Sequence, residues 1–110
     1  MVKKRVIPKT TPRHKWGAVQ TIRDGMKFPS KKEAHHYDEL KVRVKAGEVC
    51  FFLRQVPIHL PGGGTMRIDF LEFWADGTAH FVDTKGKRTQ KYKTKKRIVE
   101  ALYPFEIEER

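Results

Sequence analysis

Two aspartates and a lysine have the residue types and the spacing to hold a metal ion against a phosphate. Asp69 lies in the run MRIDFLEFW (66–74), and Asp83 and Lys85 lie at the end of the run AHFVDTKG (79–86). Both runs read as strands, and side chains alternate between the two faces of a strand, so Asp83 and Lys85 point to the same side. Charged groups at the end of a buried strand need a chemical reason, and carboxylates that bind a hard cation supply one.

The loop between these two runs decides whether the two aspartates meet. Residues 75–77, Ala-Asp-Gly, suit a three-residue hairpin loop with glycine in the left-handed position. That loop pairs Glu72 with His80 and places Asp69 opposite Asp83. Opposed carboxylates destabilise a sheet unless a cation lies between them, and Mg²⁺ is a natural one. A two-residue loop would instead put the two acids on opposite faces.

A third acid stands at the start of a predicted helix over 30–48. Ser30 with Glu33 three residues later is the capping-box pattern, and Gly47 marks the end of the helix. A capping role alone would account for Glu33.

The apolar stripe of this helix gives Glu33 a second interpretation. Tyr37, Leu40 and Val44 recur at spacings of three and four, and Glu33 lies four residues before Tyr37 on the same stripe. Its carboxylate would therefore face the sheet as a third site acid. The two roles are compatible, and the sequence leaves both open.

The other segments predict an α/β fold. Pro57 is expected to split or bend its strand, residues 62–64 (Gly-Gly-Gly) read as a turn, and Pro104 stops the second helix. The expected elements are a hairpin around Asp24-Gly25, the helix over 30–48, strands over 49–60, 66–74 and 79–86, a helix over 89–103, and a last edge strand over 105–109.

Length and charge bound the class of protein. The chain has 110 residues, enough for one domain, and a net charge of +11. Lys and Arg gather in 1–15 and 85–97, which indicates a polyanionic partner, nucleic acid first. We expect a flexible basic arm over 1–15 and a folded domain over 16–110. No apolar run has the length of a membrane span, so no membrane partner is expected. Cys50 reads as a core thiol in a reducing compartment.

An ordered set of segments resembles a known nuclease family. The segments are DGMKFPSKKEAHHYDELK, RQVPIHL, RIDF, FVDTKG and KTKKRIVEALYP. They resemble small phage-encoded proteins of the PD-(D/E)xK superfamily, a domain of unknown function distantly similar to archaeal-type Holliday junction resolvases. The resemblance runs from Asp24 to Pro104. Ile68 stands where the motif name expects proline, a position that varies in the superfamily and does not touch the chemistry.

The resemblance implies a fold and a site. The fold would be a restriction-endonuclease-like core, a mixed sheet flanked by two helices in αβββαβ order. Asp69, Asp83 and the backbone carbonyl of Thr84 would hold Mg²⁺ or Mn²⁺ against a scissile phosphate. Glu33 would orient the attacking water or a second ion, and Lys85 would position the water or stabilise the transition state.

Gln55 and Lys95 are second-tier candidates. The resemblance places a glutamine near the site at Gln55, although a glutamine at a strand end is commonly a structural hydrogen-bonding residue. Lys95 shares a helix stripe with Tyr92, Val99 and Leu102, which leads its ammonium toward the sheet. A phosphate contact would explain that position, and so would a lysine that reaches past the core to water.

These features predict a metal-dependent DNA endonuclease, structure-selective for branched DNA or weakly sequence-specific. By family analogy it would act as a homodimer in the cytoplasm of a phage's host. The rivals are a non-catalytic nucleic-acid-binding protein and an RNA-directed nuclease. The residues expected to grip the DNA backbone are Lys87, Arg88, Lys91, Lys93, Lys96 and Arg97 around the second helix and Lys3, Lys4 and Arg5 in the arm.

Overall fold

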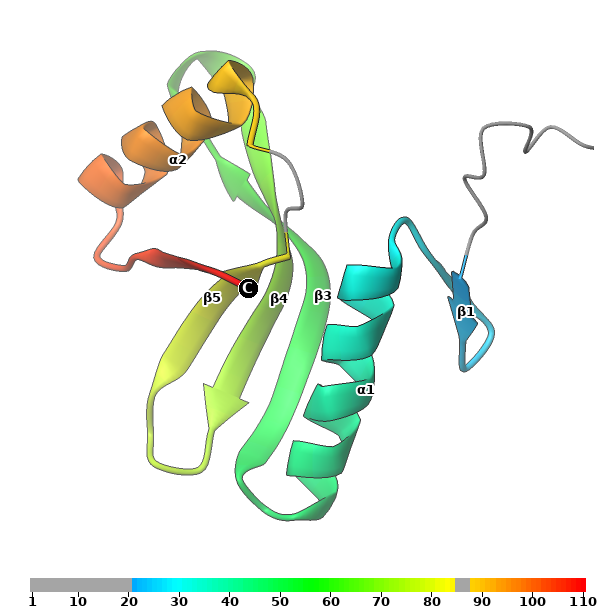
Figure 1. Cartoon of the computed structure of the whole chain (residues 1–110). Helices are drawn as coiled ribbons and strands as arrows, with labels where there is room; N and C mark the ends of the chain where they lie inside the picture. Colours follow the sequence, from blue (N-terminus) through cyan, green and yellow to red (C-terminus); the bar gives the residue numbers. More distant parts are fainter. Residues whose placement is uncertain (1–20, 85–87) are drawn as a thin grey trace, which may run out of the picture.

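The computed structural model describes residues 21–84 and 88–110 and has the predicted α/β class (Figure 1). The helices and strands follow one another in the expected order of helix, three strands, helix and strand, after a short hairpin. Their bounds are β1 (Thr21–Arg23), β2 (Met26–Phe28), α1 (Lys31–Lys45), β3 (Val49–His59), β4 (Thr65–Trp74), β5 (Ala79–Asp83), α2 (Gln90–Leu102) and β6 (Ile107–Glu109).

The main sheet is mixed and has the strand order β3-β4-β5-β6. Strands β3, β4 and β5 form an antiparallel meander, and β6 pairs in parallel with β5. A parallel pair needs a crossover connection, which α2 provides here. Helix α1 lies along β3, whereas α2 lies toward the opposite end of the sheet (Figure 1). The hairpin β1–β2 forms a separate two-stranded sheet beside α1.

The register of β4 and β5 is the one that the three-residue loop predicts. Glu72 pairs with His80, and the backbone N–H of Trp74 donates to the Thr78 carbonyl oxygen (2.9 Å) across the loop. Gly77 has a φ of +91°, which only glycine adopts without strain. The alternative two-residue loop is therefore wrong.

The ends of α1 are fixed by local sequence. Ser30 Oγ accepts the backbone N–H of Glu33 (3.1 Å), as the capping pattern predicts. At the other end Gly47 has a φ of +82°, and the N–H of Glu48 donates to the Arg43 carbonyl oxygen (2.9 Å). This arrangement is a Schellman motif, which satisfies carbonyl groups that the last turn leaves without helical partners.

Two apolar clusters hold the sheet and the helices together. One lies between α1, the hairpin and the sheet, and the other lies between α2, β6 and the far end of β4. The first contains Phe28, Ala34, Tyr37, Leu40, Val49, Phe70 and Val82, and the second contains Met66, Ile68, Val99 and Ile107. Burial of these side chains, rather than helix propensity, fixes both helices on the sheet.

Several expectations about single residues were wrong. Cys50 is exposed, because it lies where the β3–β4 register shifts between Val49 and Phe51 on an edge strand. Of the two effects expected of Pro57, the split is wrong, because β3 runs unbroken over Val49–His59 and a strand at the edge of a sheet tolerates a residue without an N–H; the bend stays a prediction. Val44 and Leu102 are exposed, because the last turns of α1 and α2 extend past the two clusters.

Within the residues that the structure describes, no helix combines the length and the apolar character that crossing a bilayer requires.

Candidate active site

Three carboxylates from three elements are withdrawn from solvent in one region of the fold. Glu33 lies in the first turn of α1, Asp69 lies in β4, and Asp83 ends β5. Their exposed fractions are 2%, 5% and 0%. Removing a charged carboxylate from water is costly unless hydrogen bonds or cations compensate it, so this burial calls for a cause beyond packing.

Asp69 and Asp83 are joined by hydrogen bonds through the backbone. The N–H of Asp69 donates to Asp83 Oδ1 (2.9 Å), and both the N–H and the hydroxyl of Thr84 donate to Asp69 Oδ2 (2.9 Å each). Thr84 is itself buried. The predicted meeting of the two aspartates at the end of β5 is confirmed, and Thr84 fixes the orientation of one of them.

Gln55 connects Glu33 to Asp69. Its Nε2 donates to Glu33 Oε2 (2.7 Å) and lies 3.4 Å from Asp69 Oδ1. Gln55 also has a φ of +54°, which is rare for a residue other than glycine and costs about 1–3 kcal/mol. Residues strained in this way concentrate at functional sites. The second-tier prediction for Gln55 therefore gains support from its geometry.

Arg54 is a site residue that the sequence did not reveal. One guanidinium nitrogen donates to Glu33 Oε2 (3.2 Å), and the guanidinium lies over the ring of Phe28 at 3.9 Å from its centroid. Burial, and then the negative charge of Asp69, raise the pKa of Glu33, against hydrogen bonds from Arg54 and Gln55 that lower it. Burial, more than the neighbouring charge, therefore disfavours the ionised form of Glu33.

The side chain of Glu33 is directed toward the sheet, while its backbone takes part in the cap of α1. Its N–H completes the bond to Ser30, while its carboxylate reaches Arg54 and Gln55. The side chain therefore has the predicted orientation toward the sheet, whereas the cap uses only the backbone N–H of Glu33, and the role of Glu33 as a third site acid stays a prediction.

Tyr92 of α2 is a second residue near the candidate site that the sequence did not reveal. Its hydroxyl donates to Glu109 (3.2 Å). Burial, and then the negative charges of Asp83 and Glu109, raise the pKa of this hydroxyl. Tyr92 therefore stays protonated beside the end of β5, where it can donate a hydrogen bond. Its place on the apolar stripe of a helix carried no signal of this role.

The basic candidates divide into three groups. Lys85, Lys87, Lys3, Lys4 and Arg5 lie outside the described residues. Lys95 Nζ donates to the backbone carbonyl of Thr65 (2.9 Å) at the start of β4, so the structure does not bring it to the carboxylates. The remaining candidates surround α2: Lys91, Lys93 and Arg97 are exposed, whereas Arg88 (3.2 Å) and Lys96 (3.0 Å) form ion pairs with Glu109.

The donor set fits a hard divalent cation by its chemistry. Asp69, Asp83 and Glu33 offer carboxylate oxygens and Thr84 offers a carbonyl, the ligand types that Mg²⁺ and Mn²⁺ take. Within 21–84 and 88–110, however, no three His, Cys, Asp or Glu side chains are arranged as a ready metal centre. Hydrogen bonds such as that from Gln55 to Asp69 would have to yield to the ion.

A fourth buried acid lies outside this site. Glu72 on β4 is 1% exposed, and its carboxylate contacts His36 Nε2 (2.6 Å) and accepts from Trp74 Nε1 (3.0 Å). Glu72 is as buried as Asp83 and shares β4 with Asp69, but its partners are different, so its substitution is a matched control for substitutions in the site.

No family model, no curated protein and no solved structure matches this chain.

Proposed function

We propose that this protein is a metal-dependent DNA endonuclease with a PD-(D/E)xK core. The observation that carries the proposal is the hydrogen-bonded set of Asp69, Asp83 and Thr84, linked to Glu33 through Gln55. The backbone N–H of Asp69 and the N–H and hydroxyl of Thr84 hold the two adjacent aspartates in fixed orientations, which suits a site that binds a cation.

The order of elements supports the same assignment. A helix with a buried acid precedes a three-stranded meander, and a crossover helix leads to a parallel fourth strand. The acids lie in β4 and at the end of β5, as the resemblance implies for a restriction-endonuclease-like core.

Asp69, Asp83, the Thr84 carbonyl and Glu33 would hold Mg²⁺ or Mn²⁺. Such an ion lowers the pKa of an attacking water and neutralises the charge that develops on the scissile phosphate. The chain's own residues prepare this chemistry: Thr84 fixes the rotamer of Asp69, and Gln55 holds Glu33 beside it.

Lys85 would position the water or stabilise the transition state, as in the prediction from the sequence. It follows Thr84 directly in the chain. Tyr92 adds a neutral donor near Asp83, and Arg54 moderates the charge of Glu33.

The net charge of +11 and the exposed lysines of α2 support a nucleic-acid substrate. Contacts to the backbone carry no sequence information by themselves, so cutting would be structure-selective, as for branched DNA, or weakly specific.

A homodimer in the host cytoplasm is part of the same proposal. Phe51 and Leu53 on β3 are 51% and 47% exposed, and the Phe51 ring stacks on Phe73 (4.5 Å between centroids). An exposed apolar patch of this kind supports an interface with a second copy. Light scattering of Leu53→Glu against wild type tests it, since a charged residue in the patch should leave a monomer.

The function is tested by cleavage of labelled linear duplex, single-stranded, flapped and four-way-junction DNA, with an RNA duplex alongside, in Mg²⁺, Mn²⁺ or EDTA. Asp83→Asn keeps the shape and Oδ1 but removes the charge, so products should vanish while binding persists. Glu72→Gln removes an equally buried charge outside the site and should cut like wild type.

One observation favours a non-catalytic nucleic-acid-binding protein instead. Each of the three acids accepts hydrogen bonds from the protein, which lessens its need for a cation. Binding of every substrate without metal-dependent products would establish that alternative. Cleavage confined to the RNA duplex would point to the ribonuclease alternative.

A further inference from the structure

Three donors converge on the carboxylate of Glu109 at the end of β6. Arg88 Nε lies 3.2 Å from Oε1, Lys96 Nζ lies 3.0 Å from Oε2, and the Tyr92 hydroxyl donates to Oε2 (3.2 Å). Tyr92 and Lys96 are four residues apart on one face of α2, and Arg88 comes four residues before Tyr92. These three residues, the α2 donor set, therefore bind one anionic group together.

The α2 donor set lies beside the candidate site. Strand β6 pairs in parallel with β5, and Glu109 is the partner of Asp83 in their register. The backbone N–H of Arg110 donates to the Asp83 carbonyl oxygen (2.9 Å), so the pairing extends to the end of β5. Adjacent strands lie about 4.8 Å apart. An anion bound by the donor set is therefore a close neighbour of a phosphate bound at Asp83.

The positive charge of the donor set exceeds the negative charge of Glu109. Among the residues that the structure describes, Glu109 is the one acid paired with Arg88 or with Lys96, so two cations share one carboxylate. The neighbouring charge of Asp83 belongs to the proposed metal site, where the ion compensates it. The side chains are also open to water, with exposed fractions of 55% for Arg88, 26% for Lys96 and 21% for Glu109. A second anion can therefore reach the donor set.

The carboxylate of Glu109 resembles a backbone phosphate in its charge and its acceptor oxygens. A carboxylate and a phosphodiester each carry one negative charge shared by two oxygens, and arginine recognises both in the same way. The hydrogen bond from Lys96 lowers the pKa of Glu109, so its carboxylate is charged at neutral pH. Arginine has five N–H donors and lysine has three, and Glu109 engages one nitrogen of each. The donor set therefore has the chemistry of a phosphate site.

We propose that the α2 donor set binds a phosphodiester group of the substrate strand next to the scissile phosphate, and that the carboxylate of Glu109 occupies this site until the substrate displaces it. The inference rests on the proposed function, since it takes the scissile phosphate from the site at Asp83. In the free protein Glu109 keeps Arg88 and Lys96 side by side. The same contact opposes binding, because the substrate must break these ion pairs to form its own.

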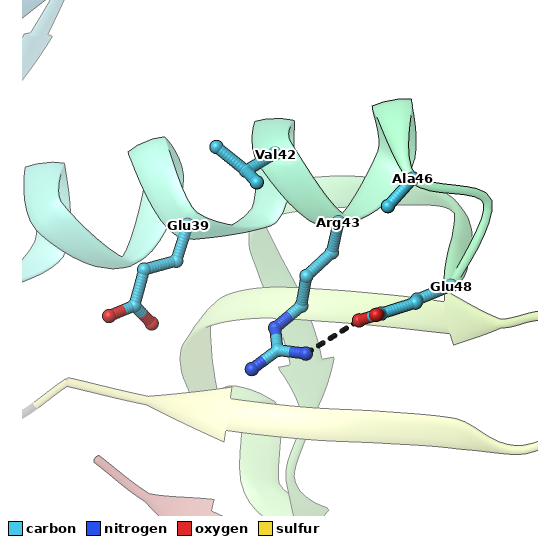
Figure 2. A pocket seen from close by; sticks show the side chains of 5 residues that line it. All are labelled: Glu39, Val42, Arg43, Ala46 and Glu48. Carbon is cyan, nitrogen blue, oxygen red and sulfur yellow. Dashed lines mark hydrogen bonds and ion pairs between the residues drawn. The ribbon is translucent and has the colours of Figure 1, made fainter.

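A second arginine–glutamate pair provides a comparison away from the site. Arg43 Nη1 donates to Glu48 Oε1 (2.7 Å), and Figure 2 shows this pair with Glu39 on the same side of α1, in a hollow of about 370 Å³. Two of the three charged residues that line this hollow are acidic, so positive charge is not in excess there. Glu48 leads into β3, which lies at the opposite edge of the sheet from β6. Loss of Glu48 therefore releases an arginine far from the α2 donor set.

The test is equilibrium binding of a fluorescent duplex oligonucleotide in EDTA, measured by anisotropy. Glu109→Gln removes the competing charge but keeps the shape and one acceptor oxygen. It should tighten binding about fivefold, the scale of an exposed ion pair that the substrate no longer has to break. Lys96→Ala should cost more affinity in the Glu109→Gln protein than in the wild type, where Glu109 already engages this ammonium.

Two matched controls remove the same charge elsewhere. Glu108→Gln changes the adjacent residue of β6, whose carboxylate has other partners. Glu48→Gln releases Arg43 at the other edge of the sheet. Both should tighten binding much less than Glu109→Gln.

The wild type supplies a reading that needs no variant to fold. In protein labelled with carbon isotope at the glutamate carboxyl groups, saturating duplex should move the NMR signal of Glu109 and leave that of Glu108 nearly in place. A Glu109 signal unmoved by DNA, equal affinities of Glu109→Gln and Glu108→Gln, or weaker binding by Glu109→Gln would overturn the phosphate site.

Cleavage by the same proteins separates this inference from the nuclease proposal. If Glu109→Gln tightens binding as expected but the wild type never cuts, the phosphate site stands and the nuclease fails. If the wild type cuts, Asp83→Asn does not, and Glu109→Gln binds like Glu108→Gln, the nuclease stands and the phosphate site fails.

Discussion

Gln55 is the residue where an unusual backbone and the candidate site coincide. Its left-handed φ of +54° is in the middle of β3, where an extended backbone would be expected. From this position its amide reaches both Glu33 and Asp69. We infer that the strain is retained because this backbone conformation directs the Gln55 amide to both acids and so holds them beside each other. An extended backbone at this position would not fix the amide in that direction.

Two substitutions at this position separate strain from hydrogen bonding. Gln55→Ala and Gln55→Gly both remove the amide, but only glycine adopts a positive φ freely. The glycine variant should therefore exceed the alanine variant in unfolding free energy by about 1 kcal/mol. Denaturant unfolding measures this difference. Equal stabilities, or a more stable alanine variant, would mean that Gln55 is not held left-handed.

Metal binding should stabilise the folded protein. An ion that binds only the native state adds about 2.7 kcal/mol at a concentration of 100 Kd, so Mg²⁺ or Mn²⁺ should raise the wild-type Tm. Asp69→Asn and Asp83→Asn should lose most of the rise, whereas Glu72→Gln should keep it. Thermal melts with a metal titration and an EDTA control measure the effect. An undiminished rise in Asp83→Asn would place the metal elsewhere.

Among single residues, the positions of the two aspartates were easier to predict from the sequence than the residues that contact the candidate site. Asp69 and Asp83 could be paired because a three-residue loop sets their register locally. Arg54 and Tyr92 could not be found, since their roles depend on how the hairpin and α2 pack against distant residues.

The β1–β2 hairpin is the element that supports the site from outside. Met26 Sδ and the Phe28 ring both contact Arg54, which in turn contacts Glu33. The hairpin is fastened to α1 through Asp24, which accepts hydrogen bonds from Tyr37 and Lys41. Loss of this attachment should therefore affect both stability and the site.

Asp24→Asn tests the attachment through its pH dependence. Hydrogen bonds from Lys41 and Tyr37 lower the pKa of Asp24 below its ordinary 3.8. Stability from a carboxylate with a lowered pKa is present above the ordinary value and is lost as the pH falls through the lowered one. Asn tolerates the positive φ of this turn, so the variant should melt below wild type at pH 7 and converge with it in strong acid. A gap in Tm that stays constant with pH would contradict this account.

Elements whose ends are set by short sequence motifs were predictable, whereas the solvent exposure of single residues within those elements was not. Ser30, Gly47 and the Asp24-Gly25 turn act within a few residues, and each forms as expected. Val44 and Leu102 continue apolar stripes but emerge into solvent, because a periodic pattern does not say where the neighbouring sheet ends.

Across the whole molecule, positive charge is not equally available to a polyanion. Arg88 and Lys96 are paired with Glu109 on β6, whereas the exposed basic residues of α2 are Lys91, Lys93 and Arg97. The basic character of the second helix was predicted correctly from the sequence. The sequence could not show that Glu109 on β6 lies beside this helix and forms ion pairs there. The net charge of +11 therefore overstates what α2 offers to DNA.

Paired and exposed lysines of α2 should differ in DNA binding. Lys93→Ala should lower the salt slope of binding by about 1, as expected for one lost phosphate contact. Lys96→Ala should change it less, since Glu109 already neutralises this ammonium. Anisotropy over a salt series compares the two variants. A larger loss in Lys96→Ala would reverse this order of contributions.

The most direct test of the central claim is the single-turnover cleavage rate in Mg²⁺ on the best DNA substrate, for wild type, Asp83→Asn and Glu72→Gln. Even an outer partner of a metal ligand is worth about 10- to 100-fold, so Asp83→Asn should lose more than about 100-fold while Glu72→Gln stays near wild type. Wild-type cleavage that persists in EDTA, or that survives Asp83→Asn undiminished, would contradict a metal-dependent nuclease built on these carboxylates.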